Sequence, residues 1–337
     1  MLNVYSITAT AENWVHDAVY AKVKSALEAL NSGGTAPDWA DGMHEDLADR
    51  EALKRCYDAF RAAAEGLSVK QRTKVLRVLE DQNNIPAVFD GVTACLRIDA
   101  TPARIRKPTA ALFAAAFDAL KSLKVRDRQY QTIFDTLPGK CCPFCGIEPF
   151  ESPGLAREDL DHYLPRSLYP FAGANLRNLA PMGGKCNRAY KKDQDIICDD
   201  NTGQRRRCFD PYGENWATVS LMASRPFEGE SVGPFRLPAW QVDLLGDALS
   251  VATWDQIFQI RHRYLSEQAQ CAFPRVDGAF RILVQRAGGF HFDTGRGDRR
   301  LRTISRFCPS VDSRRRRSLE AGGVRDAVPS MCGIGCL

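Results

Sequence analysis

The sequence lacks long apolar runs. No stretch approaches the roughly 20 consecutive apolar residues that cross a bilayer as a helix, so we expect neither a membrane span nor a membrane partner. The amino terminus, MLNVYSITATAENW, also lacks the basic start, apolar middle and small-residue cleavage site of a secretory signal. Together these absences predict a cytoplasmic protein.

Lysine is absent from residue 285 onward, although this segment holds eleven arginines against five acidic residues, a net charge of +6. The preceding 284 residues are about neutral, with 35 basic and 36 acidic residues. Because no sustained apolar period runs through its end, residues 286–337 are predicted to form a basic, poorly ordered tail. Its positive charge would add sequence-independent attraction to nucleic acid.

Apolar residues recur every three or four positions in four stretches of the first 135 residues, at 11–30, 45–67, 68–81 and 109–123. This spacing predicts amphipathic helices, and Ser68 and Thr109 are acceptable N-cap residues for the last two. A further helix is predicted at 253–270. The fold class expected for the chain is mainly α.

Cysteine is plentiful, at twelve residues. A reducing compartment makes free thiols and metal ligands more plausible than a disulfide framework. Cys142 and Cys145 stand apart because they bracket Pro and Phe in CPFC, a spacing that lets two thiolates of a tight knuckle face one cation. Gly146 fits the turn that leads out of the knuckle.

Four short motifs follow one another where prolines, glycines and cysteines replace alanine and leucine. They are CPFC at 142–145, LDHYLPRS at 160–167, NLAP at 178–181 and KCNRAYKK at 185–192. If 160–164 is a strand, Asp161 and His162 point to opposite faces and do different jobs. A carboxylate suits Mg²⁺, whereas a neutral imidazole can take a proton from water near pH 7. Asn187 opens a predicted helix, where its amide oxygen can complete the coordination of the cation.

In order and spacing these motifs resemble the HNH nuclease family, and DHYLPRSLYP, NLAPM, CNRAYK and FDPY look like HNH proteins of bacterial antiphage and restriction systems. The resemblance covers residues 141–192 and implies an embedded small α+β module of two strands and a helix, the ββα-metal fold. It assigns Asp161 and Asn187 to a divalent ion, Mg²⁺ or Mn²⁺. It also implies that His162 is the general base and that Asn178 braces the loop between the strands.

Many modules of this family also hold a structural zinc ion through two Cys-x-x-Cys pairs, the second of which ends just before the final family residue. Cys142, Cys145 and Cys186 match this pattern, but Gly183 occupies the position of the remaining thiol. The fourth zinc ligand stays open between Cys208, which we prefer, Cys198 and Cys141. A zinc-free reduced cluster is the alternative.

Basic residues near the motifs are candidates for contacts with phosphate groups. Arg188, Lys191 and Lys192 follow Asn187 on the predicted helix, and Arg166 and the run 205–207 would extend the track. A solvated helix face is the alternative interpretation.

The expected organisation is a helical region (1–135), an HNH nuclease module with a zinc knuckle (136–215), a mixed and helical region packing on it (216–285) and the basic tail (286–337). The resemblance implies an endonuclease that hydrolyses DNA as the effector of a bacterial antiphage system, acting with a partner such as an ATPase or sensor. One alternative is a zinc-stabilised nucleic-acid-binding module that has lost catalysis. Another is a nuclease directed at RNA, because phosphate contacts do not read sequence.

Overall fold

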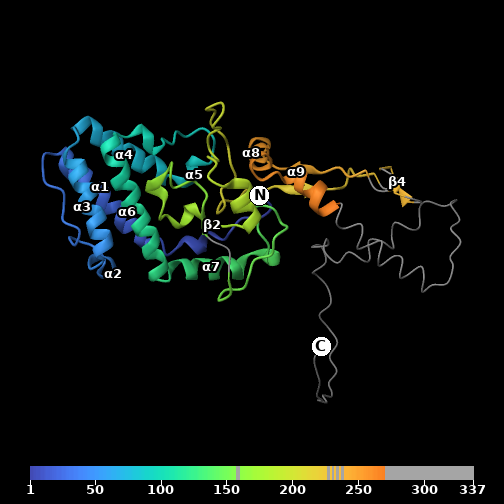
Figure 1. The fold of residues 1–337 in the computed structure, drawn as a ribbon, viewed down its shortest axis with the longest axis horizontal. Helices are drawn as coiled ribbons and strands as arrows, with labels where there is room; N and C mark the ends of the chain where they lie inside the picture. The colour runs from blue at the N-terminus through green and yellow to red at the C-terminus, as the bar shows by residue number, and fades with distance from the viewer. Residues whose placement is uncertain (157–159, 226–227, 230, 233–234, 237–238, 270–337) are drawn as a thin grey trace, which may run out of the picture. The chain divides into compact units, whose positions relative to one another are not determined.

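The computed structural model describes residues 1–156, 160–225, 228–229, 231–232, 235–236 and 239–269 (Figure 1). The predicted tail at 286–337 therefore lies outside the described residues. The described part is mainly α-helical, as the sequence predicts. All of it belongs to one compact unit of the chain.

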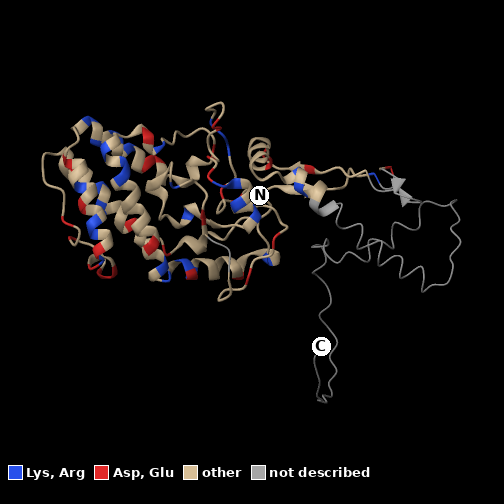
Figure 2. Ribbon diagram, viewed as in Figure 1, with Lys and Arg blue, Asp and Glu red and all other residues tan. Residues whose placement is uncertain are grey.

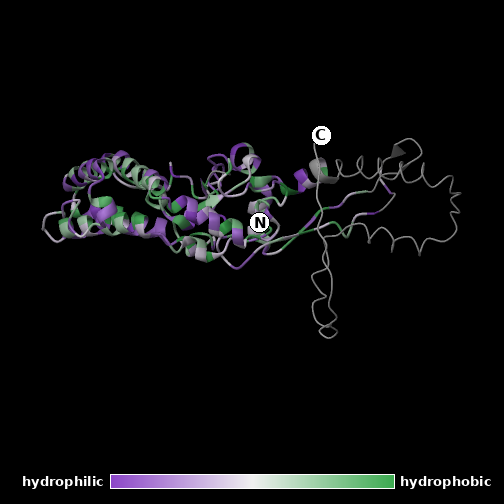
Figure 3. Cartoon of the chain, turned by 90° about the horizontal axis from the view of Figure 1, so that it is seen from below, coloured by the Kyte–Doolittle hydropathy of each residue, from purple (hydrophilic) through white to green (hydrophobic). Residues whose placement is uncertain are grey.

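Four long helices form the first part of the chain: α1 (Trp14–Asn31), α3 (Glu51–Glu65), α4 (Val69–Asn83) and α6 (Ala103–Ser122). Helix α1 contacts the other three, and α3 packs along α6 (Figure 1). Figure 3 shows hydrophobic and hydrophilic residues alternating around these helices, as expected when one face of each is buried.

The observed helix boundaries confirm one predicted cap and correct another. Ser68 precedes α4 and forms a reciprocal capping box with Gln71, whose side chain accepts a hydrogen bond from the Ser68 backbone N–H at 3.0 Å. The prediction for Thr109 is wrong, because α6 begins at Ala103, contains Pro108 and buries Thr109. Ile105 is fully buried on the same helix, so packing of this first turn extends the helix across the proline.

Shorter helical segments connect and extend the long ones. They are η1 (Ile7–Thr10), α2 (Glu45–Ala48), α5 (Ile85–Val88), η2 (Ile98–Ala100), α7 (Val125–Thr136) and η3 (Pro138–Lys140). Helix α7 contacts both α6 and η1.

The described strands pair in three antiparallel two-stranded sheets: β1 (Leu160–His162) with β2 (Leu179–Pro181), β3 (Thr218–Ser220) with β6 (Asp243–Leu245), and β4 (Ser231–Val232) with β5 (Phe235–Arg236). Between β1 and β2 the chain forms η4 (Pro170–Ala172) and η5 (Leu176–Asn178). A short π-helix, η6 (Cys186–Lys191), follows β2. Two antiparallel strands are thus followed by one helix.

The helix predicted at 253–270 is divided in the structure. Helix α8 (Ala248–Phe258) begins earlier than expected, because the Asp247 carboxylate accepts a hydrogen bond from the Ser250 backbone N–H at 2.9 Å and caps it. Gln259 then adopts a left-handed conformation with φ of 55° and ends the helix. The chain continues as α9 (Ile260–Arg263) and η7 (Tyr264–Ala269).

The hydrophobic core crosses the boundary expected at residue 135. One of its two clusters joins residues of α1, α3, α4 and α6 to five residues of the strand region, Leu160, Phe171, Ala174, Leu176 and Leu179. Gln129 of α7 adds polar contacts, because its Nε2 lies 2.9 Å from the carbonyl oxygen of Leu176 and 3.2 Å from that of Leu179. The helical region and the strands therefore share one interior.

Candidate active site and metal centre

Strand β1 carries the two residues expected to do chemistry. It pairs with β2 so that Asp161 lies opposite Ala180 and His162 lies opposite Leu179. Both side chains are half-buried, whereas the preceding Leu160 is buried in the helical core. The pairing therefore holds Asp161 and His162 at the boundary between core and solvent.

His162 is fixed by a carbonyl acceptor. Its Nε2 lies 2.8 Å from the carbonyl oxygen of Gly173, and because a carbonyl can only accept, Nε2 carries the proton. In the neutral ring Nδ1 is then the basic nitrogen. Burial lowers the pKa of His162 to about 4; the Gly173 carbonyl raises it, and the charges of Arg166, Lys191 and Arg126 lower it. The imidazole is therefore neutral at pH 7.

Asn178 lies completely buried at the end of the loop between the strands. Its Oδ1 accepts a hydrogen bond from the Leu164 backbone N–H at 2.7 Å. Its Nδ2 donates to the carbonyl oxygens of Leu164 at 3.1 Å and Ala172 at 3.2 Å. One side chain thus connects the two ends of this loop and the middle of it.

Lys191 brings helix η6 against β1. Its Nζ lies 2.8 Å from Oδ2 of Asp161, and its side chain is only 1% exposed. Asn187 lies four residues earlier on the same helix and is half-buried. Because residues about one turn apart leave a helix on the same side, Asn187 faces the same part of the molecule as Lys191.

The predicted phosphate-contacting residues do not share one environment. Arg166, Arg188 and Lys192 are exposed, whereas Lys191 is buried in its ion pair with Asp161. The arginines at 205–207 instead bind acceptors within the protein: Arg205 donates to the Ile197 carbonyl oxygen, Arg206 pairs with Asp199, and Arg207 pairs with Asp247. Figure 2 shows acidic and basic residues interspersed along the helices of the first 135 residues.

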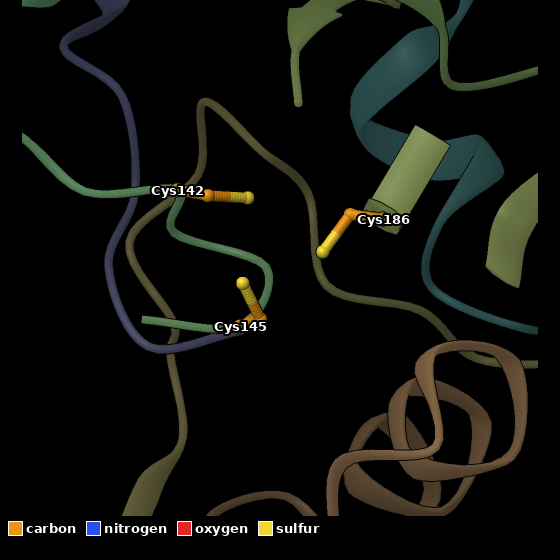
Figure 4. Close-up of side chains that lie close together, drawn as sticks. All are labelled: Cys142, Cys145 and Cys186. Atoms are coloured by element: carbon orange, nitrogen blue, oxygen red, sulfur yellow. The ribbon is translucent and has the colours of Figure 1, made fainter. Parts of the chain in front are cut away.

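The three cysteines singled out by the sequence come together. Cys142 and Cys145 lie in the loop after η3, Cys186 begins η6, and all three are buried with their Sγ atoms within 4.8 Å of one another. Figure 4 shows the sulfurs converging on one space. Tetrahedral zinc with Zn–S bonds of about 2.3 Å needs sulfurs about 3.8 Å apart. The cluster could therefore hold a metal ion such as zinc.

A tight turn brings the first two thiols together. The backbone N–H groups of Cys145 and Gly146 both donate to the Cys142 carbonyl oxygen, at 3.2 and 2.7 Å. Gly146 has a φ of 68°, a conformation that favours glycine, as expected for the turn out of the knuckle. Hydrogen bonds from the Cys142 and Cys186 thiols lower the pKa of Cys145, whereas burial raises the pKa of Cys142.

The structure does not bring the candidates for the fourth ligand into this group. The Sγ atom of Cys208, which we preferred, donates to the Ile196 carbonyl oxygen at 2.8 Å, and that of Cys141 donates to the Gly139 carbonyl oxygen at 3.2 Å. Cys198 is half-buried and likewise stands outside the group.

Sequence reasoning missed Arg263, a fully buried residue at the end of α9. Its Nη1 lies 3.1 Å from Sγ of Cys186, and its guanidinium carbon stands 4.5 Å from the centre of the Tyr190 ring. No local motif marks this arginine, because its partner lies 77 residues away in the chain.

A polar cavity of about 470 Å³ lies elsewhere, lined by residues of α1 and α4 together with Asn175 and Arg177. None of the predicted catalytic or metal-binding residues lines it. Among the described residues, no helix combines the length and apolar character that crossing a membrane would need.

Comparisons with protein-family models, curated proteins and solved structures find no match to this chain.

Proposed function

We propose that this chain is a metal-dependent endonuclease of the HNH type that hydrolyses phosphodiester bonds in DNA. The observation that carries the proposal is the contact between Lys191 and Asp161, because it sets the helix that begins with Cys186 and Asn187 against the strand that bears Asp161 and His162. Two antiparallel strands and a helix in this order supply the residue types that the chemistry requires.

The donor chemistry of the site fits a divalent ion. Asp161 offers a carboxylate and Asn187 an amide oxygen, both hard ligands of the kind that Mg²⁺ and Mn²⁺ prefer. The Lys191 ammonium lies against that carboxylate, so a metal ion that binds there competes with it. When bound there, the ion would neutralise charge on the scissile phosphate and support the departing 3′ oxygen.

His162 acts as the general base in this proposal. Nδ1 takes a proton from water, and the water oxygen forms the new bond to phosphorus. The bond between phosphorus and the 3′ oxygen breaks, its electron pair stays on the 3′ oxygen, and that oxygen takes a proton from solvent. The Gly173 carbonyl holds the ring in the tautomer that leaves Nδ1 basic. Asn178 keeps the loop that carries Gly173 in place, while Arg166, Arg188 and Lys192 lie exposed and available to contact neighbouring phosphates.

The test compares nicking of plasmid and cleavage of single-stranded DNA and RNA in Mg²⁺ by the wild type, His162→Ala and the exposed-histidine control His262→Ala. We expect His162→Ala to lose activity by about 100-fold or more, as general-base removal does, and His262→Ala to retain it. Equal nicking by the wild type and His162→Ala would refute the catalytic role of His162. Cleavage confined to RNA would redirect the proposal to that substrate.

A second candidate, a zinc-stabilised nucleic-acid-binding module without catalysis, is favoured by one observation. The Lys191 ammonium occupies a side of Asp161 that a metal ion would use. Binding of DNA without cleavage of any substrate in Mg²⁺ or Mn²⁺ would support this candidate. A role in antiphage defence, with an ATPase or sensor as partner, is part of the primary proposal and is tested by the genes cotranscribed with this one.

A further inference from the structure

The three-cysteine cluster offers three of the four ligands of a tetrahedral zinc site, and the half-buried carboxyl side chain of Glu148 lies beside it. The Glu148 backbone belongs to the same knuckle, because its carbonyl oxygen accepts a hydrogen bond from the Cys142 N–H at 2.8 Å. The backbone of Glu148 is therefore held beside Cys142, while its side chain remains able to rotate.

The Glu148 carboxyl group fills the space next to Gly183. A Cβ atom placed on Gly183 would lie 1.7 Å from Oε2 and 2.7 Å from the carboxyl carbon of Glu148. The Gly183 backbone N–H in turn donates to Sγ of Cys142 at 3.3 Å. The carboxyl group thus takes the room that a side chain at 183 would need, directly beside the cluster.

One oxygen of this carboxyl group has a partner and the other does not. Oε1 accepts a hydrogen bond from the Lys185 backbone N–H at 3.0 Å, whereas Oε2 is buried without a hydrogen-bond partner among the described residues. A buried carboxylate oxygen that lacks a donor is costly. Coordination of a cation would satisfy it.

Arg263 connects the carboxyl group to the thiols. The same buried guanidinium lies 3.1 Å from Sγ of Cys186 and 3.9 Å from Oε1 of Glu148. A buried guanidinium needs anionic neighbours, and three thiolates with one carboxylate around Zn²⁺ leave a net negative charge that Arg263 partly neutralises. The position of Arg263 therefore suits a metal site that contains both thiolate and carboxylate ligands.

We propose that Glu148 is the fourth ligand of a Cys₃Glu zinc site formed with Cys142, Cys145 and Cys186. Its carboxylate oxygens stand outside the group of atoms that lie within 4.8 Å of one another, so the side chain rotates toward the sulfurs when the ion binds. A carboxylate oxygen then coordinates zinc at about 2.0–2.2 Å. This assignment is independent of the proposed nuclease function.

The experiment measures metal binding by the full-length protein. Wild type, Glu148→Ala, Glu148→Gln and the control Glu151→Ala, an exposed glutamate of the same loop, are purified, and their zinc content and zinc affinity are determined by competition with a chelator. We expect one zinc ion per wild-type chain. Loss of the carboxylate should weaken binding by about tenfold or more, because even outer-shell substitutions cost roughly 10–100-fold. Glu151→Ala should behave as the wild type.

A gain-of-ligand variant sharpens the test. In Glu148→Ala/Gly183→Cys the space beside the cluster is vacated and a thiol is supplied there, so zinc affinity should recover. With Co²⁺ in place of zinc, this double variant should show stronger thiolate-to-metal charge-transfer absorption than the wild type, because four thiolates replace three. Glu148→Gln retains the volume and the acceptor for Lys185, which separates loss of a ligand from loss of folding.

Unchanged zinc affinity in both Glu148 variants would overturn the proposal and leave water as the fourth ligand. Loss of zinc from Cys208→Ser with retention in Glu148→Ala would assign the position to Cys208 instead. A wild-type chain that binds neither Zn²⁺ nor Co²⁺ would show that the thiols form a metal-free cluster.

Discussion

The substitution Lys191→Met removes the ammonium group that pairs with Asp161. The Lys191 side chain is 1% exposed and that of Asp161 is 17% exposed, so the substitution leaves a largely buried carboxylate without its ammonium. Removing one partner of a buried pair costs about 3–5 kcal/mol, and the residual exposure of Asp161 favours the lower value. We therefore expect a loss of about 3 kcal/mol in the free energy of unfolding without divalent ions, measured by urea denaturation.

Mg²⁺ should reverse much of this loss if Asp161 is a metal ligand. An ion that binds only the folded state adds about 2.7 kcal/mol at a concentration 100 times its dissociation constant, and without Lys191 it meets no competing cation. Lys192→Met is the matched control, since Lys192 is the exposed neighbour. Absence of stabilisation of Lys191→Met by Mg²⁺ would refute the assignment of Asp161 to the metal, and stabilisation that persists in Asp161→Asn/Lys191→Met would do the same.

Two further stability predictions follow from buried polar groups. Asn178→Ala removes the partners of three backbone groups, the Leu164 N–H and the carbonyl oxygens of Leu164 and Ala172. Urea denaturation should therefore show a loss of about 2–4 kcal/mol in the free energy of unfolding, which the exposed control Asn201→Ala should not show. A loss below about 1 kcal/mol would contradict this role of Asn178. Burial lowers the pKa of His16 from 6.5 to about 4, while its hydrogen bond with Asn83 raises it. Because the unfolded chain then binds more protons between these values, stability should fall as the pH drops below 6.5, by about 2 kcal/mol at pH 5 from this group. His16→Phe should show that much less acid destabilisation, and an unchanged pH profile would exclude this explanation.

The helices were the part of the fold that the sequence predicted best, because apolar spacing and an N-cap are local signals. Ser68 shows this, since cap and capping partner lie three residues apart. The start of α6 was misplaced because Pro108 looks like a break in the sequence, whereas the burial of Ile105 that carries the helix past it is a tertiary effect. The sequence did not predict the end of α8 at Gln259, because the apolar pattern continues on both sides of it in Ile257, Phe258 and Ile260.

In the candidate site, too, the sequence predicted the features that depend on local signals and missed those that depend on tertiary contacts. Local spacing predicted that Cys142 and Cys145 come together, and the family resemblance added Cys186; the structure groups all three. The sequence did not predict that Lys191 turns inward to Asp161, since a lysine in a polar helix looks like a solvated residue until its partner thirty positions away is placed. Glu148 carried only a weak signal, an acid three residues after CPFC, and its meaning depends on the missing side chain at Gly183.

The shared interior between α1, α3, α4, α6 and the β1–β2 region has a consequence for how this protein can be rearranged. A segment cut at residue 135 would expose Leu160, Phe171 and Leu179 on one side and the helix faces that cover them on the other. Recombination could therefore exchange the strands and knuckle as a cassette only together with the helices. In engineered chimaeras, crossover points should therefore lie away from the boundary near residue 135. The helical region would have to be transferred together with the candidate site.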